Sequence, residues 1–220
     1  MEVTRPAEIE RESMAIIERE LSERGIVLPS ESAAVVRRVI HTTADFDYAE
    51  NLRFTPDAAG LAAASLRGGV IVTDTNMALA GISRPAMKKL GCQARCFMAE
   101  EEIAWEAKER GVTRAAVSME RAAALYPNAV YAVGNAPTAL LRLSELMENG
   151  LRPALVIGVP VGFVNVVESK ERAFAVCTQY GVPAIVAMGR KGGSTVAAAI
   201  CNALLYAAAE MTAPETRGGA

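Results

Sequence analysis

Near the start of the chain, hydrophobic residues recur at the spacing of amphipathic helices. Over residues 6–24, isoleucine and leucine side chains return at helical intervals, and charged side chains fill the other positions. This pattern predicts a helix, and Gly25 predicts its end. A second helix is predicted from Ser30 or Ser32 to about Thr43, since aliphatic residues again gather on one side.

Further along, short apolar runs alternate with longer helical runs. The apolar runs predict strands at residues 70–72, 94–98, 129–133, 154–157 and 183–187. The longer runs predict helices at about residues 56–67, 77–82, 99–110, 114–125, 138–149, 169–180 and 195–210. This alternation is typical of βαβ units, and it predicts an α/β protein with a parallel sheet between two helical layers.

The chain shows no internal repeat, low-complexity block or linker. Its 220 residues fit one domain with a sizeable core. We therefore expect a single domain over residues 1–210, with a helical segment at its N-terminus. Residues 211–220 are expected to form a loose tail.

Composition narrows the class of protein. The net charge is -2 and no basic stripe is present, so we expect no nucleic-acid partner. No apolar run reaches the roughly 18 residues of a membrane span, and the charged N-terminus lacks a signal core, so we expect a cytoplasmic protein without membrane association. Four cysteines show no metal or disulfide framework and are interpreted as buried or half-buried thiols.

Four turns that follow predicted strands are rich in glycine, proline, asparagine or hydroxyl residues. They are TDTNM at residues 73–77, GNAPT at 134–138, GVPVGF at 158–163 and GRKGGS at 189–194. Ligands of such sheets bind beyond the carboxyl ends of the strands, where free N–H groups receive anions. GRKGGS adds two cations and predicts a carboxylate or phosphate cradle, although each turn alone could be merely a tight βα connection.

Familiar cofactor motifs are absent from the sequence. No turn has the GKS or GKT of a phosphate loop, and none has the dinucleotide pattern GxGxxG. Clustered metal-ligand motifs and the GxSxG of α/β-hydrolases are also missing. We therefore expect neither a nucleotide cofactor nor a metal.

The chain has one histidine, His41, at the predicted end of the second helix. Its unperturbed pKa of about 6.5 lets it exchange protons near neutrality. The helix dipole would favour the protonated imidazole, and Arg37 and Arg38 would oppose it unless they face away. A lone histidine is more often structural or exposed, so the residues alone leave a catalytic role open.

Two long blocks resemble the precorrin-8X methylmutase family. They are AVGNAPTALLRLSELM at residues 132–147 and PALVIGVPVGFVNVVESK at 153–170. Shorter blocks match in the same order at residues 6–20, 35–54, 71–84, 111–119 and 189–204. The resemblance covers nearly the whole chain and includes both the cobalt-free and the cobalt-containing branch of the family.

The resemblance implies a flavodoxin-like doubly wound sheet in a three-layer α/β/α arrangement, and a homodimer. It also implies an isomerase of corrin biosynthesis that needs no cofactor. That enzyme moves a methyl group from C-11 to C-12 of a tetrapyrrole, precorrin-8X or cobalt-precorrin-8, to give hydrogenobyrinate or cobyrinate. His41 corresponds to the family's catalytic histidine, which protonates a ring nitrogen.

The same resemblance predicts which residues line the substrate site. They are Ser13, Asp74, Met77, Arg84, Arg114, Gly134, Asn135, Ala136, Thr138, Arg190, Lys191, Gly192, Gly193 and Ser194. Two rival interpretations remain: a flavin- or nucleotide-binding flavodoxin-like protein, and a non-enzymatic corrinoid carrier. Bound chromophore would support the first, and product binding without turnover would support the second.

Overall fold

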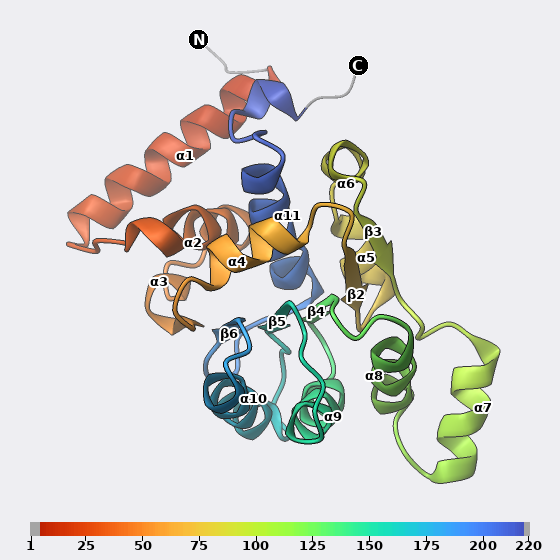
Figure 1. Cartoon of the computed structure of the whole chain (residues 1–220). Helices are drawn as coiled ribbons and strands as arrows, with labels where there is room; N and C mark the ends of the chain where they lie inside the picture. Colours follow the sequence, from red (N-terminus) through yellow and green to blue (C-terminus); the bar gives the residue numbers. More distant parts are fainter. Residues whose placement is uncertain (1–4, 218–220) are drawn as a thin grey trace.

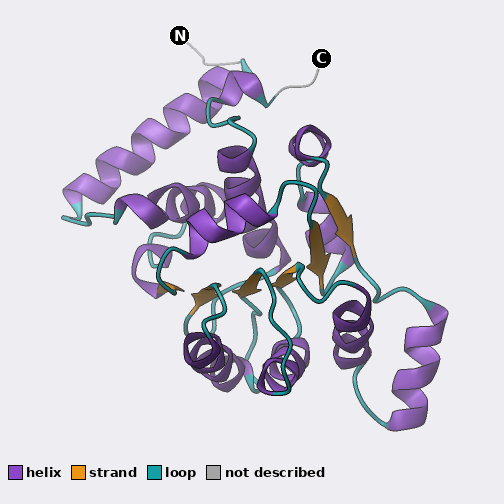
Figure 2. Ribbon diagram, in the orientation of Figure 1, coloured by secondary structure: helices purple, strands orange, loops and turns teal. Residues whose placement is uncertain are grey.

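A six-stranded sheet forms the centre of the protein, with helices on both faces (Figures 1 and 2). The computed structural model describes residues 5–217. The strands are β1 (Leu52–Phe54), β2 (Val70–Thr73), β3 (Gln93–Arg95), β4 (Val130–Val133), β5 (Leu155–Gly158) and β6 (Ala184–Ala187). Their order across the sheet is β1-β6-β5-β4-β2-β3.

The five strands from β2 to β6 are parallel. Numbered from β2, their order across the sheet is 2-1-3-4-5, which is the flavodoxin-like arrangement. Every residue of β4, β5 and β6 is buried, because helices cover both faces of these central strands. The predicted doubly wound α/β fold is confirmed.

The first helical layer covers one face of the sheet. It contains α2 (Ser30–Thr43), α4 (Ala58–Ser65), α5 (Asn76–Gly81), α6 (Arg84–Leu90) and α11 (Ser194–Ala208), with α1 (Pro6–Glu23) packed outside α2. The opposite layer contains α7 (Glu101–Arg110), α8 (Arg114–Leu125), α9 (Pro137–Glu148) and α10 (Val166–Tyr180). None of the helices within residues 5–217 is long and apolar enough to span a membrane.

The structure adds elements that the sequence pattern does not predict. Strand β1 pairs antiparallel with β6, so the sheet is mixed and not wholly parallel. The short helix α3 (Tyr48–Asn51) leads into β1, and α6 begins after Ser83, whose hydroxyl accepts from the N–H of Ala86. The predicted strand at 94–98 is shorter and begins earlier, at Gln93.

The C-terminal segment also differs from the prediction of a loose tail. Met211 is buried, and η1 (Pro214–Thr216) packs against α1. The guanidinium of Arg217 pairs with Glu10 and lies 4.3 Å from the ring centre of Tyr206. Apolar burial and two ion pairs to α1, Arg217 with Glu10 and Glu215 with Arg11, therefore hold residues 211–217 on the first helical layer. Residues 218–220 lie outside the described residues. The single domain over residues 1–210 stays a prediction.

Candidate active site

The strand order places a topological switch point between β2 and β4. The chain leaves β2 toward α5 in one helical layer, and it leaves β4 toward α9 in the other layer. In a doubly wound sheet such a switch point, at the carboxyl edge, is where ligands bind. The predicted site turns at 74–77 and 134–138 follow the two strands that flank this switch point.

Asp74 connects these two turns. Its carboxylate accepts hydrogen bonds of 2.8 Å from the backbone N–H groups of Gly134, Asn135 and Ala136. Burial raises the pKa of Asp74, and the three backbone donors oppose that rise. Asp74 is 0% exposed, and its carboxylate contacts the backbone of the 134–136 turn. Its place among the substrate-binding residues stays a prediction.

The turn at 189–194 packs tightly against its neighbours. A Cβ on Gly192 would lie 2.1 Å from the carbonyl oxygen of Val159, and one on Gly134 would lie 2.8 Å from Cα of Ser194. The Ser194 hydroxyl is 2.8 Å from that of Thr75. Glycine is therefore needed at both positions, and the turns after β2, β4, β5 and β6 form one continuous edge.

His41 lies in the last turn of α2, which packs on α11. Its side chain is half-buried. Arg38 and Thr42, which flank it in α2, line a cavity of about 230 Å³ that also contains Met77 of α5. The remaining lining residues are Gly81, Thr195, Ala198, Ala199, Asn202 and Tyr206. The structure thus brings the helix end bearing His41 to the start of α5 and α11.

The surroundings of His41 favour the neutral imidazole. Burial lowers the pKa of His41 below its usual value of 6.5, and the charge of Arg38 lowers it further. Glu10 raises the pKa, whereas Arg217 lowers it. The net direction is downward, so the helix dipole does not dominate as it would at an exposed helix end.

Glu10 connects α1, α2 and the C-terminal segment. Its carboxylate accepts from Arg38 at 2.6 Å and also pairs with Arg217. A second cavity, of about 320 Å³, lies at this junction and shares Arg38 and Tyr206 with the first. The predicted site residue Ser13 follows Glu10 by one helical turn on α1 and is half-buried.

The predicted cations of the 189–194 turn have partners of different kinds. The Nζ of Lys191 bonds to carboxylate oxygens of Asp45 at 2.6 Å and Asp47 at 2.5 Å. The guanidinium of Arg190 lies 5.5 Å from the ring centre of Phe163. Lys191 is thereby neutralised and tied to the segment that follows His41, while Arg190 keeps its charge free of any carboxylate partner among residues 5–217.

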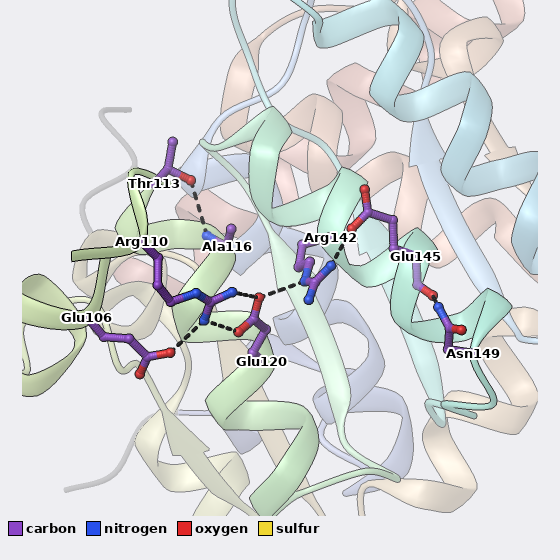
Figure 3. Close-up of polar contacts among 8 residues, drawn as sticks. All are labelled: Glu106, Arg110, Thr113, Ala116, Glu120, Arg142, Glu145 and Asn149. Carbon is purple, nitrogen blue, oxygen red and sulfur yellow. Dashed lines mark hydrogen bonds and ion pairs between the residues drawn. The ribbon is translucent and has the colours of Figure 1, made fainter. Parts of the chain in front are cut away.

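Arg114 is the first residue of α8 and Thr138 is the second residue of α9, both in the opposite layer. The hydroxyl of Thr113 donates to that of Thr138 at 2.8 Å and accepts from the N–H of Ala116. An ion-pair network lies next to this contact, and it is seen in Figure 3 together with Thr113. Arg110 and Arg142 contact Glu120 from α7 and α9, so the network holds α7, α8 and α9 together.

Two other predicted residues, in α5 and α6 of the first layer, are exposed. Met77 is 69% exposed, and Arg84 is the first residue of α6. Glu10, Arg38, Tyr206 and Arg217 were not predicted as site residues. Arg38 could have been predicted to lie near His41, because the two residues are one helical turn apart in the sequence. Arg217 is distant in sequence, and no sequence pattern points to it. No group of three or more His, Cys, Asp or Glu side chains within residues 5–217 could hold a metal ion.

Comparison with known proteins places the chain in a family. A family model described as precorrin-8X methylmutase matches residues 8–207. A cobalt-precorrin-8 methylmutase of Leptospira interrogans is 41% identical over 90% of this chain and 91% of its own length. One of Salmonella typhimurium is 45% identical over 79% of this chain and 80% of its own length.

The chain belongs to the precorrin-8X methylmutase family. A solved precorrin-8X methylmutase of Thermus thermophilus superposes with a TM-score of 0.81 and 38% identity, over 92% of this chain and 98% of that one. The chain is therefore a methylmutase, an isomerase that transfers a methyl group within one molecule. The flavodoxin-like fold serves a methylmutase here, which argues against a flavin- or nucleotide-binding protein.

Proposed function

We propose that the protein moves the methyl group at C-11 of precorrin-8X, or of cobalt-precorrin-8, to C-12, with His41 as general acid. The observation that carries this proposal is the position of His41. It is the only histidine in the chain, and its neighbours Arg38 and Thr42 in α2 line a cavity within the family-matched residues. Protonating a ring nitrogen draws electron density from the carbon that receives the methyl group.

The environment of His41 supports the view that its imidazole takes up a proton when the substrate binds. In the free protein, burial and Arg38 keep the pKa of His41 low. The acetate and propionate groups of the tetrapyrrole bring negative charge, which favours the imidazolium. The acid form is thus generated in the complex, where it is used.

The rim of the site supports binding of several carboxylates. Arg190 and the glycine-rich turn at 189–194 lie at the carboxyl edge of the sheet, where α11 begins. Backbone N–H groups and guanidinium groups form charge-assisted hydrogen bonds with carboxylates. These contacts hold the macrocycle in one orientation, which lowers the entropic part of the barrier.

A homodimer is part of the proposal. Val161, Phe163 and Val164 are exposed at this edge, and Phe163 is 84% exposed. Large apolar side chains gathered on one surface are typical of an interface. Arg114 stands at the exposed start of α8, from which it can contribute to the site of a second copy.

Turnover by the cofactor-stripped protein tests the proposed reaction. After dialysis against a chelator, with no nucleotide, flavin or metal added, the protein should convert precorrin-8X or cobalt-precorrin-8 to the corrin product, followed by its absorption spectrum. A requirement for an added cofactor would contradict the proposal. Tight product binding without any conversion would favour the alternative, a non-enzymatic corrinoid carrier.

A further inference from the structure

Lys170 is a fully buried lysine that none of the roles above uses. It lies in α10 and is 0% exposed. Its Nζ donates to the carbonyl oxygens of Gly189 at 2.9 Å and Lys191 at 2.7 Å. Within residues 5–217 it forms no ion pair with a carboxylate. Burial of an ammonium group without a counter-charge is costly, so its position calls for an explanation.

The two carbonyls belong to the predicted carboxylate-binding turn. In a trans peptide unit the N–H points away from the C=O of the same unit. Fixing the Gly189 and Lys191 carbonyls toward α10 therefore turns the N–H groups of Arg190 and Gly192 to the opposite side. Neither N–H has an acceptor in the described part of the chain.

The charges around the turn strengthen this argument. Lys191 is neutralised by Asp45 and Asp47, so its side chain offers little charge to a ligand. Arg190 belongs to the turn and forms no ion pair with a carboxylate in residues 5–217, and Lys170 brings a second positive charge to the carbonyl side of the turn. Burial lowers the pKa of Lys170 to about 8, which leaves most of the ammonium protonated at neutral pH.

We propose that Lys170 is a positioning residue that holds the 189–192 turn so that the N–H groups of Arg190 and Gly192 bind a substrate carboxylate. The proposal rests on the proposed function, because it requires a carboxylate-bearing tetrapyrrole at this turn. Lys170 does not touch the substrate. It acts through the backbone of the turn and through its charge.

The test compares Lys170→Met with Ser169→Ala. Ser169 is the adjacent, equally buried residue of α10, and its hydroxyl donates to the carbonyl of Val166 and not to the turn. Lys170→Met should raise the Kd for hydrogenobyrinate and the KM for precorrin-8X by roughly 10–100-fold, since bonds to charged groups are at stake. The kcat should change by less than about threefold, and Ser169→Ala should leave Kd and KM unchanged.

Amide NMR of the wild-type protein gives an independent readout. Adding hydrogenobyrinate should shift the N–H signals of Arg190 and Gly192 downfield, as expected for hydrogen bonds to a carboxylate. The absence of these shifts would overturn the proposal even if Lys170→Met failed to fold. A folded Lys170→Met with wild-type Kd would overturn it as well.

The outcomes separate this proposal from the proposed function. If the wild-type protein neither binds hydrogenobyrinate nor converts precorrin-8X, the proposed function fails and this proposal fails with it. If the wild-type protein does both and Lys170→Met matches it, only the role of Lys170 is wrong. A fall in kcat with unchanged KM would place Lys170 in the chemical step and not in positioning.

Discussion

Two opposing influences act on the imidazole at the end of α2. Burial and Arg38 disfavour the cation, and Glu10 favours it, although Glu10 also shares its charge with Arg38 and Arg217. A general acid works best when its pKa lies near the working pH. Burial and Arg38 lower the pKa of His41 in the free protein, and under the proposed function the substrate carboxylates would raise it again in the complex.

A titration of His41 in the free protein tests this balance. Because the chain has one histidine, its imidazole NMR signals need no further assignment. The midpoint should lie below pH 6.5, and Arg38→Met should raise it, since a repelling cation is removed and Glu10 loses a partner. Arg19→Met, on the exposed face of α1, is the matched control and should leave the midpoint unchanged.

The sign of this shift fixes two pH dependences. The acid must be protonated, so kcat/KM should fall as pH rises through the pKa of free His41, below 6.5. Between the folded pKa and 6.5 the unfolded state binds more protons, so His41 also makes stability rise with pH in that window. A midpoint above 6.5 in the free protein would contradict both statements.

At the scale of elements, the buried carboxylate of Asp74 connects the turn after β2 to the turn after β4. Asp74→Asn removes the charge and replaces one acceptor oxygen with an NH₂ group that cannot accept. Loss of these charge-assisted bonds should lower the free energy of unfolding by about 2–4 kcal/mol, measured with urea. The exposed Asp57, changed to Asn, should cost less than about 0.5 kcal/mol. Equal effects of the two changes would show that Asp74 is not a brace.

Most elements were predictable because their periods are clear. The helix at residues 114–125 and the strands near 130, 155 and 184 follow directly from amphipathic and apolar runs. Strand β1 was not predictable, since three residues carry no period and its pairing with β6 depends on tertiary contacts. The turns after the strands predicted which edge of the sheet carries the candidate site. They did not predict that Asp74 is buried and bonded to the 134–136 turn.

Pairings distant in sequence were the main part of the site that the sequence could not predict. Glu10 and Arg217 meet beside Arg38 only after α1 and the C-terminal segment pack on the first layer. In the sequence, Lys170 is simply part of the helix predicted at residues 169–180. Its contact with the 189–191 turn depends on how α10 packs near β6. Such residues become visible only in three dimensions.

At the scale of the whole molecule, we expect a homodimer. Light scattering at micromolar concentration should give about twice the chain mass of 23.2 kDa. Phe163 is 84% exposed in the single chain. Phe163→Ser should shift the protein toward the monomer, because the expected apolar contact of this ring with the second copy would be lost. Trp105→Ser removes another exposed aromatic side chain, on α7 of the opposite layer, and should leave the mass unchanged. A monomeric wild-type mass would contradict the dimer and any cross-subunit role for Arg114.

The central claim is that His41 supplies the proton for methyl migration. The most direct test is single-turnover conversion of precorrin-8X by His41→Asn, with hydrogenobyrinate binding and unfolding measured on the same sample. Since His41 is half-buried at a helix end, the variant should fold and keep most of its product affinity. Methyl migration should slow by about 10²–10⁴-fold, the usual contribution of general acid catalysis. Migration at close to the wild-type rate would show that another group supplies the proton.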